Sequence, residues 1–346
     1  MTGPDRRLPA EWEPQDGVLV AWPHAHTDWA ARLAEVESTY AALGAAVTRF
    51  ERLVVLVPDP ALERRARALL LAAGAEAARL VFCQVDYDDT WLRDTGPITV
   101  IEDGVPVLLD FRFTGWGGKY GAERDDALVA GLVASGLIQP HCRHEVIDFA
   151  LEGGAIDTDG EGTLLSTWTC LSQRHPEKPR AAIAGVLAER LGQHRVLLLE
   201  HGQIEGDDTD AHVDTLARFA SPEDIVYQHC DAPEDAHFTP LSRMAEELAA
   251  LRRRDGRHYR LHPLPWPSPI LDEGRRLAAS YANFLIIDGA VLVPAYDDPA
   301  DRVAAQVLRA AFPGREVISI PCRPLIWQNG SLHCITMQLP RGVLKP

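Results

Sequence analysis

The chain has 346 residues, of which 46% are hydrophobic and 24% charged, and its formal net charge is −16. These proportions are those of a folded globular enzyme and argue against a disordered chain. The negative charge disfavours nucleic-acid partners, whose binding depends on neutralising phosphates, and it favours cationic small molecules.

The length exceeds the size at which one hydrophobic core stops growing, so we expect one repeat-built domain or two domains. The N-terminal segment has no apolar signal core, and no stretch approaches the roughly 18 apolar residues of a membrane-spanning helix. The six cysteines form no C-x-x-C pair, so we expect reduced thiols. These features predict a cytoplasmic protein with no membrane partner.

Helical and strand patterns alternate along the chain. Residues 28–50 have helical spacing, and a buried-strand run follows at 53–59. A second helix and strand are predicted at 61–74 and 79–85, and a hairpin at 98–113 turns at Asp103-Gly104. Further hairpins are predicted at 155–168, 215–229 and 283–296, helices at about 122–136, 177–192, 237–253 and 299–311, and strands at 196–201 and 316–322.

Five polar positions recur at the same point of these strand–helix units, spaced by about 50 to 70 residues as in repeat proteins. They are Asp94, Glu152, His212, Asn283 and Cys334. This recurrence predicts an α/β fold in which five modules form a pseudo-fivefold ring around a central active site, within one catalytic domain of residues 1–346. An ordinary α/β sheet with polar strand ends is the alternative.

The segment around Cys334 is typical of an exposed nucleophile. A turn-type cluster at 329–331 precedes it and a strand-like run at 335–337 follows it. Alternation along a strand would turn His333 away from Cys334, which favours the distant His212 as the base. The alternative is a cysteine buried as a small hydrophobic residue.

The polar positions match the chemistry of guanidinium hydrolysis. A planar guanidinium needs two carboxylates to hold it, and Asp94 and Asp214 are the candidate clamps. Cys334 would attack the central carbon, and His212 would protonate the departing ammonia and then activate water. Glu152 would orient and charge the imidazole, which in turn favours the Cys334 thiolate.

Each of these residues also has a structural interpretation. Arg93 and Asp94 could form an ion pair at a turn, Glu152 could cap a loop, and His212 could be a core histidine. The acidic run 205–210 lacks the glycine and terminal glutamate of an EF-hand loop. No zinc-binding spacing of histidines and cysteines is present, so no metal is predicted.

Eight segments carry a resemblance to a known family. They are LPAEWEPQDGVLVAWPH (8–24), DDTWLRDTGP (88–97), FTGWGGKY (113–120), LEGGAIDTDGEGTLLST (151–167), DDTDAHVDTLARF (207–219), SYANFLIIDGAVLVP (280–294), YDDPAD (296–301) and LHCITMQLP (332–340). In this order and spacing they resemble the agmatine deiminase and bacterial-type peptidylarginine deiminase family. The resemblance implies a pentein fold, the five-module α/β propeller.

The resemblance also implies an activity and a set of site residues. The expected reaction converts agmatine and water to N-carbamoylputrescine and ammonia, a step of putrescine (polyamine) synthesis, without a cofactor or metal. The implied residues are Cys334 as nucleophile, His212 as acid and base, Glu152 as its partner, Asp94 and Asp214 as guanidinium clamps, and Trp91, Trp116 and Asn283 in substrate binding. The implied partner is a small cationic guanidinium; the oligomeric state stays open, with a homodimer as one option.

Several positions depart from the family pattern. Ala211 replaces a glycine beside the histidine, Trp168-Thr169 replaces an acidic pair, Asp157 replaces a histidine, and 328–331 replaces a glycine run. None of these replacements removes a proposed catalytic group, but all of them change the wall of the pocket. Peptidyl-arginine deimination, hydrolysis or amidino transfer on another small guanidine, and a catalytically silent binding scaffold therefore remain alternatives. Residues 113–120 are the candidate lid.

Overall fold

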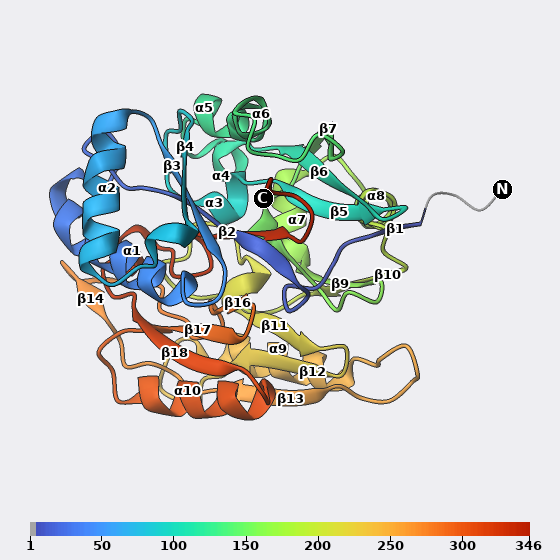
Figure 1. The fold of residues 1–346 in the computed structure, drawn as a ribbon. Helices are drawn as coiled ribbons and strands as arrows, with labels where there is room; N and C mark the ends of the chain where they lie inside the picture. The colour runs from blue at the N-terminus through green and yellow to red at the C-terminus, as the bar shows by residue number, and fades with distance from the viewer. Residues whose placement is uncertain (1–4) are drawn as a thin grey trace.

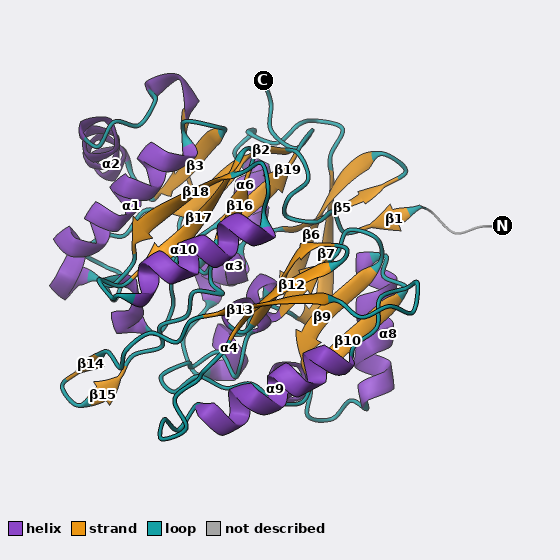
Figure 2. Ribbon diagram, turned by 90° about the horizontal axis from the view of Figure 1, so that it is seen from below, coloured by secondary structure: helices purple, strands orange, loops and turns teal. Residues whose placement is uncertain are grey.

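The computed structural model describes residues 5–346, which form a mixed α/β fold of small sheets with helices packed against them (Figures 1 and 2). Within these residues the strands form six separate sheets, and none closes on itself. No helix in the same range is long and apolar enough to cross a bilayer.

Four of the sheets share one plan. An antiparallel hairpin is followed by a helical connection, and the third strand then pairs in parallel with the second strand of the hairpin. A parallel pair needs a crossover, and the helices supply it. The units are β5 (Ile98–Glu102), β6 (Val105–Arg112), α4 (Gly115–Gly118), α5 (Glu123–Asp126), α6 (Leu128–Ala134) and β7 (Arg143–Ala150); β8 (Ile156–Thr158), β9 (Thr163–Thr167), α7 (Trp168–Arg174), α8 (Arg180–Leu191) and β10 (Arg195–Leu199); β11 (Ala217–Ser221), β12 (Asp224–Gln228), α9 (Phe238–Ala250) and β13 (Arg260–Leu264); and β16 (Leu285–Ile287), β17 (Ala290–Ala295), α10 (Ala300–Ala311) and β18 (Glu316–Pro321).

A fifth sheet of the same plan is built from both ends of the described chain. The last strand, β19 (Met337–Pro340), pairs antiparallel with β2 (Gln15–Ala21), and the two lie side by side in Figure 2. β2 then leads through α1 (Leu33–Val47) to its parallel partner β3 (Arg52–Val57). α2 (Pro60–Ala72) and β4 (Leu80–Gln84) extend this sheet, β1 (Arg6–Arg7) joins the edge of β5, and β14 (Leu271–Asp272) and β15 (Arg275–Arg276) form a separate small hairpin.

Helices of several units also contact the preceding unit. α10 contacts β13, α9 contacts β10, and α1 contacts β18. The strands beneath them are almost continuously apolar, as expected for parallel strands covered on both faces. Each of these contacts therefore joins two neighbouring sheets through one helix.

The predicted hairpins are confirmed, and so are the helices that follow them. The turns at Asp103-Gly104 and Asp288-Gly289 lie between paired strands as expected. One prediction is wrong: residues 332–335 form a turn, and the strand begins only at Met337. The backbone N–H groups of His333 and Cys334 both donate to Asn283 Oδ1, which removes them from any strand ladder. Strand alternation therefore does not apply to His333 and Cys334.

Candidate active site

Cys334 lies at the end of a buried turn that begins after a short 3-10 helix, Leu325–Gln328. Its Sγ is 3.4 Å from Asn283 Oδ1 and 3.8 Å from Asp214 Oδ2. Burial raises the pKa of the Cys334 thiol well above its ordinary value, and the charges of Asp214 and Asp94 raise it further. A cation bound between these carboxylates would reverse part of that effect, because it offsets their negative charge.

Asn283 fixes the backbone of this turn. Its Oδ1 accepts hydrogen bonds from the backbone N–H groups of His333 and Cys334 at 2.8 and 3.3 Å. Its amide nitrogen donates to the carbonyl oxygen of Asp214 at 3.4 Å. Asn283 therefore lies behind the candidate nucleophile, where it holds Cys334 next to Asp214, and it is not among the residues that line the cavity in front of Cys334.

His212 lies between two carboxylates. Its Nδ1 is 3.6 Å from Asp94 Oδ1, and its Nε2 is 3.8 Å from Glu152 Oε2. Burial lowers the pKa of His212, but the charge of Asp94 and the adjacent Cys170 and Glu152 outweigh it and hold that pKa well above its usual range. These neighbours therefore favour the protonated form of His212, as they would not for a buried core histidine without carboxylates.

Asp94 faces the cavity with its side chain held from two sides. Trp116 Nε1 donates to Asp94 Oδ2 at 2.9 Å, and the backbone N–H of Gly154 donates to Oδ1 at 3.1 Å. Burial raises the pKa of Asp94 to about 6; the charge of His212 opposes this rise and that of Asp214 adds to it. The ion pair of Arg93 runs to Glu11 at 3.8 Å, so Asp94 is not the partner of its sequence neighbour.

The glycines after Glu152 leave room for the site. A Cβ at Gly154 would lie 2.6 Å from His212 Nδ1 and 2.8 Å from Asp94 Oδ1. A Cβ at Gly153 would lie 2.2 Å from the carbonyl oxygen of Arg93. These separations are shorter than van der Waals contact, so the Glu-Gly-Gly segment is required by close packing beneath Asp94 and His212.

Arg174 is a site residue that the sequence did not reveal. Its Nε donates to Glu152 Oε1 at 2.6 Å, and its Nη1 donates to Asp210 Oδ2 at 2.6 Å. Burial raises the pKa of Glu152, but His212 and Arg174 outweigh it and lower that pKa below its ordinary value. Glu152 is thereby an ionised partner for His212. The predicted loop-capping role of Glu152 finds no support in these contacts.

Asp214, the second candidate clamp, lies below Cys334 and contacts His333. His333 Nδ1 is 2.8 Å from Asp214 Oδ2, and His333 Nε2 is 2.8 Å from Glu11 Oε2. Burial raises the pKa of Asp214, but His333 and His212 outweigh it and lower that pKa. The other carboxylate oxygen of Asp214, Oδ1, is buried without a hydrogen-bond partner among the described residues. One oxygen of this clamp is therefore free for a ligand.

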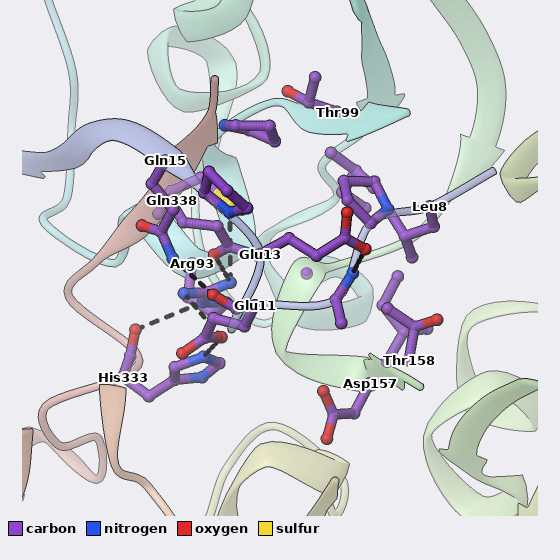
Figure 3. Close-up of a pocket in the computed structure, with 18 residues that line it drawn as sticks. Leu8, Glu11, Glu13, Gln15, Arg93, Thr99, Asp157, Thr158, His333 and Gln338 are labelled. Carbon is purple, nitrogen blue, oxygen red and sulfur yellow. Dashed lines mark hydrogen bonds and ion pairs between the residues drawn. The ribbon is translucent and has the colours of Figure 1, made fainter. Parts of the chain in front are cut away.

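A small cavity of about 50 Å³ lies behind this pair, on the side of the N-terminal segment (Figure 3). In Figure 3 the side chains of Glu11, Arg93 and His333 converge at its wall. Arg218 Nη2 also donates to Glu11 Oε2, at 2.7 Å. No sequence pattern indicates this network, because Glu11 and His333 are 322 positions apart.

The substrate-sized cavity lies in front of Cys334 and measures about 220 Å³. Of the predicted site residues, Trp91, Asp94, Trp116 and Cys334 line this cavity, whereas His212, Glu152 and Asp214 are not among its lining residues. Trp91 packs against Gly330, where a Cβ would lie 2.2 Å from its ring. The remaining lining residues are Asp28, Asp89, Tyr120, Asp208, Thr209, Arg275, Trp327, Gln328, Asn329 and Gly330. The cavity thus combines tryptophan surfaces with several carboxylates.

The candidate lid is folded over this cavity. Tyr120 donates from its hydroxyl to Asp208 Oδ2 at 2.9 Å, and Asn329 Nδ2 donates to the same oxygen at 3.0 Å. Trp116 has φ of 54° and ψ of 49°, a left-handed conformation that is rare for a bulky residue. The indole of this strained Trp116 donates a hydrogen bond to Asp94. Segment 113–120 therefore contributes part of the cavity wall and a hydrogen bond to a candidate clamp.

The acidic run 205–210 forms a loop that organises itself. Asp207 Oδ1 accepts from the backbone N–H of Thr209 at 2.9 Å, and Asp207 Oδ2 accepts from that of Ala211 at 2.8 Å. Asp210 is paired with Lys119 and Arg174. Asp207 and Asp210 are therefore bonded to other groups of the protein.

Comparison with known proteins gives a consistent result. The family model for Porphyromonas-type peptidyl-arginine deiminase matches residues 7–340. Agmatine deiminase from Stutzerimonas stutzeri is 33% identical over 96% of this chain and 95% of its own length. A crystal structure described as a putative arginine deiminase from Porphyromonas gingivalis has 46% identity and a TM-score of 0.92, with 98% of this chain and 100% of that chain covered. A cysteine-to-serine variant of agmatine deiminase from C. jejuni, solved with substrate bound, has 34% identity and a TM-score of 0.91, with 100% and 99% covered.

Proposed function

This chain belongs to the Porphyromonas-type peptidyl-arginine deiminase family and is a hydrolase of C–N bonds in linear amidines, and we propose that it deiminates agmatine through a covalent intermediate on Cys334. The observation that carries the proposal is the pair of buried carboxylates, Asp94 and Asp214, beside one thiol and one cationic histidine. A planar cation with several N–H donors can bind between two such carboxylates through charge-assisted hydrogen bonds. N-carbamoylputrescine and ammonia are the proposed products.

The proposed reaction begins with binding of the guanidinium between Asp94 and Asp214. Its positive charge offsets the field of the two carboxylates, so the Cys334 thiol loses its proton to solvent. The thiolate then attacks the guanidinium carbon and forms a C–S bond. Because His212 is already protonated, it donates its proton to one amino group, the C–N bond breaks, and ammonia leaves.

The second half of the reaction uses the same histidine in its neutral form. His212 removes a proton from water as the water attacks the thiouronium carbon. The C–S bond then breaks, its electron pair returns to the Cys334 sulfur, and the product leaves as a substituted urea. Glu152 keeps the imidazole oriented and favours its charged form, and Arg174 fixes Glu152 from the other side.

The outer part of the cavity supports agmatine over free arginine. Agmatine carries an ammonium group at the end opposite its guanidinium, whereas arginine carries a carboxylate there as well. Asp28, Asp89 and Asp208 line this part of the cavity. Burial raises the pKa of Asp89 to about 8, and the charges of Asp125, Asp28 and Asp208 add to this rise. A second cation would relieve that repulsion, and a substrate carboxylate would increase it.

We further propose that the five units of the fold form a pentein propeller around the candidate site. Two observations support this arrangement. Helices α1, α9 and α10 each contact a strand of the preceding unit, and β19 joins the end of the chain to β2 near its beginning. The five predicted polar positions come from five different units, as a common axis requires.

Ammonia release tests the function. Purified protein is incubated with agmatine, arginine, a blocked arginine peptide and smaller guanidines, with Cys334→Ser as the inactive control. Activity on agmatine alone supports the proposal. Activity only on the blocked peptide would instead make the protein a peptidyl-arginine deiminase, the activity that names the matching family model. Transfer of the amidino group would appear as a new guanidine when a second amine is added.

A further inference from the structure

Two other ligand-type side chains, Glu152 and Cys170, lie close to His212, and Glu152 faces its Nε2. Glu152, Cys170 and His212 each offer one atom, and these atoms all lie within 4.8 Å of one another. All three side chains are buried. Glu152 Oε2 and His212 Nε2 have no hydrogen-bond partner among residues 5–346, although they are only 3.8 Å apart. Buried polar atoms without partners are rare, and their convergence indicates a ligand.

We propose that Glu152, Cys170 and His212 form an inhibitory binding site for a zinc-type divalent cation. One thiolate, one imidazole and one carboxylate are all ligands that Zn²⁺ accepts. Their summed charge of two negative units, with His212 neutral, balances the ion. Binding forms zinc–sulfur, zinc–nitrogen and zinc–oxygen bonds, and the protons of the Cys170 thiol and of His212 Nε2 pass to solvent.

The spacing of the three atoms fits this cation. Bonds of about 2.0–2.3 Å in a tetrahedral site hold ligand atoms roughly 3.3–3.8 Å apart. The separation of His212 Nε2 from Glu152 Oε2, 3.8 Å, is already at the upper end of this range. No pair of ligand atoms in the cluster is more than 4.8 Å apart, so binding requires a contraction of at most about 1.5 Å. The fourth position would be taken by water.

The neighbours of the cluster resemble the outer partners of a zinc site. A ligating histidine usually has a carboxylate at its other nitrogen, and His212 Nδ1 faces Asp94 Oδ1 at 3.6 Å. A ligating carboxylate is usually hydrogen-bonded as well, and Arg174 Nε donates to Glu152 Oε1. The orientation of both ligands is therefore fixed without the ion.

Occupancy of this site would remove His212 and Glu152 from the proposed reaction. Cys334 and Asp214 lie outside the cluster, so substrate binding should persist while turnover stops. Thr209 lines the front cavity, and its hydroxyl oxygen accepts a hydrogen bond from the backbone N–H of His212 at 3.2 Å. The three cluster side chains are buried and do not line that cavity, so we expect the ion to enter slowly.

Direct zinc binding tests the site without reference to activity. Chelator-treated Cys334→Ser protein, which lacks the thiol that lines the front cavity, is dialysed against zinc, and bound metal is measured by mass spectrometry. We expect one equivalent fewer when Cys170→Ser is added and no change when Cys83→Ser is added, since Cys83 is a buried thiol of a different cluster. Cobalt should give a thiolate charge-transfer band that only Cys170→Ser removes. Equal zinc content with and without Cys170, or no bound zinc at all, would overturn the proposal.

The inhibitory effect rests on the proposed function and is measured separately. Zinc should lower kcat of the wild-type enzyme slowly, with KM unchanged and with recovery after chelation. The rates of Cys170→Ser are compared with and without zinc, each relative to its own zinc-free rate, and should show no slow loss. Rapid loss with a raised KM in both proteins would place zinc on Cys334 and contradict the inference. A protein that binds zinc at Cys170 but shows no activity in the substrate panel would refute the proposed function alone.

Discussion

The front and the back of the centre around Cys334 both contain buried carboxylates, but they differ in how completely the protein itself compensates their charge. At the back, Glu11 contacts Arg218 and His333, each within 2.8 Å. Burial raises the pKa of Glu11, but Arg218, His333 and Arg93 outweigh it and hold that pKa far below its ordinary value. At the front, Asp94 has a raised pKa, and an oxygen of Asp214 has no partner among the described residues.

This difference distinguishes carboxylates that belong to the scaffold from carboxylates that belong to the binding site. A buried carboxylate that the protein itself neutralises stabilises the fold or at least does not oppose it. A buried carboxylate that is left without a cation costs stability, and it persists where a cation arrives from outside. The following substitutions test this distinction, beginning with the chemical centre itself.

Cys334→Ser should have the largest effect. A neutral hydroxyl is a far weaker nucleophile than a thiolate, so we expect turnover to fall by roughly 10⁴-fold or more while the thermal midpoint changes little. Ammonia release measures the loss, and calorimetry with agmatine should still show binding. Turnover near the wild-type rate would refute covalent catalysis by Cys334.

Glu11→Gln should mainly affect stability, because it removes the anion shared by Arg218, His333 and Arg93. Breaking a buried pair leaves uncompensated charge, and we expect a loss of about 3–5 kcal/mol in the free energy of unfolding. Urea denaturation measures this loss. Glu13→Gln is the control, since its partner Arg7 is exposed and its pair should contribute little. Equal effects of the two substitutions would mean that the buried contacts of Glu11 stabilise the fold no more than a partly exposed ion pair.

Asp94→Asn should have the opposite pattern to Glu11→Gln, with a loss of activity and no loss of stability. It removes one clamp, so we expect kcat/KM for agmatine to fall by about 2–5 kcal/mol in transition-state free energy. It also removes a carboxylate whose pKa burial raises to about 6, so the free energy of unfolding at pH 7 should stay the same or rise by about 1–3 kcal/mol. Steady-state kinetics and urea denaturation test the two parts. A destabilised but fully active variant would make Asp94 a structural residue.

The pH dependence of kcat/KM follows from the same carboxylate. Asp94 must be ionised to hold a guanidinium, and its pKa in the free protein is raised to about 6. We therefore expect kcat/KM to decrease as pH falls through about 6, and Asp94→Asn to lose this step. The stability contribution has the opposite sign. Because the folded-state pKa is raised, the stabilising contribution of this group is present below pH 4 and is lost as pH rises through about 6. An acid limb that persists in Asp94→Asn would assign it to another group.

Tyr120→Phe should have the smallest effect. It removes one hydrogen bond between the lid segment and Asp208, worth about 1 kcal/mol at a partly exposed position. We expect KM for agmatine to rise by a few-fold with kcat nearly unchanged. An unchanged KM would mean that the Tyr120–Asp208 contact does not help to close the cavity.

The sequence predicted the elements that depend on local rules. Hairpins with Asp-Gly turns were found because the turn requires positive φ, and the repeated polar positions were found because each follows the same element. Arg174, Glu11 and the role of His333 could not be found in this way. Their partners are side chains from other units, and a buried ion pair leaves no periodic pattern. The strand expected around Cys334 was wrong because the backbone N–H groups of His333 and Cys334 donate to the side-chain amide oxygen of Asn283, which is distant in the sequence.

The pairing of β19 with β2 has a consequence for the order of synthesis. The ribosome makes β2 first, and the strand that pairs with it emerges some 300 residues later. Until then, one edge of β2 has no partner, and unpaired edges invite association with other chains. The proposed nucleophile, Cys334, lies just before β19, so a nascent chain carries the carboxylates and the histidine of the candidate site but not this thiol. The proposed nucleophile and the last strand of the first sheet are therefore synthesised together. An interrupted chain would lack both, so it would be prone to aggregation and unable to react.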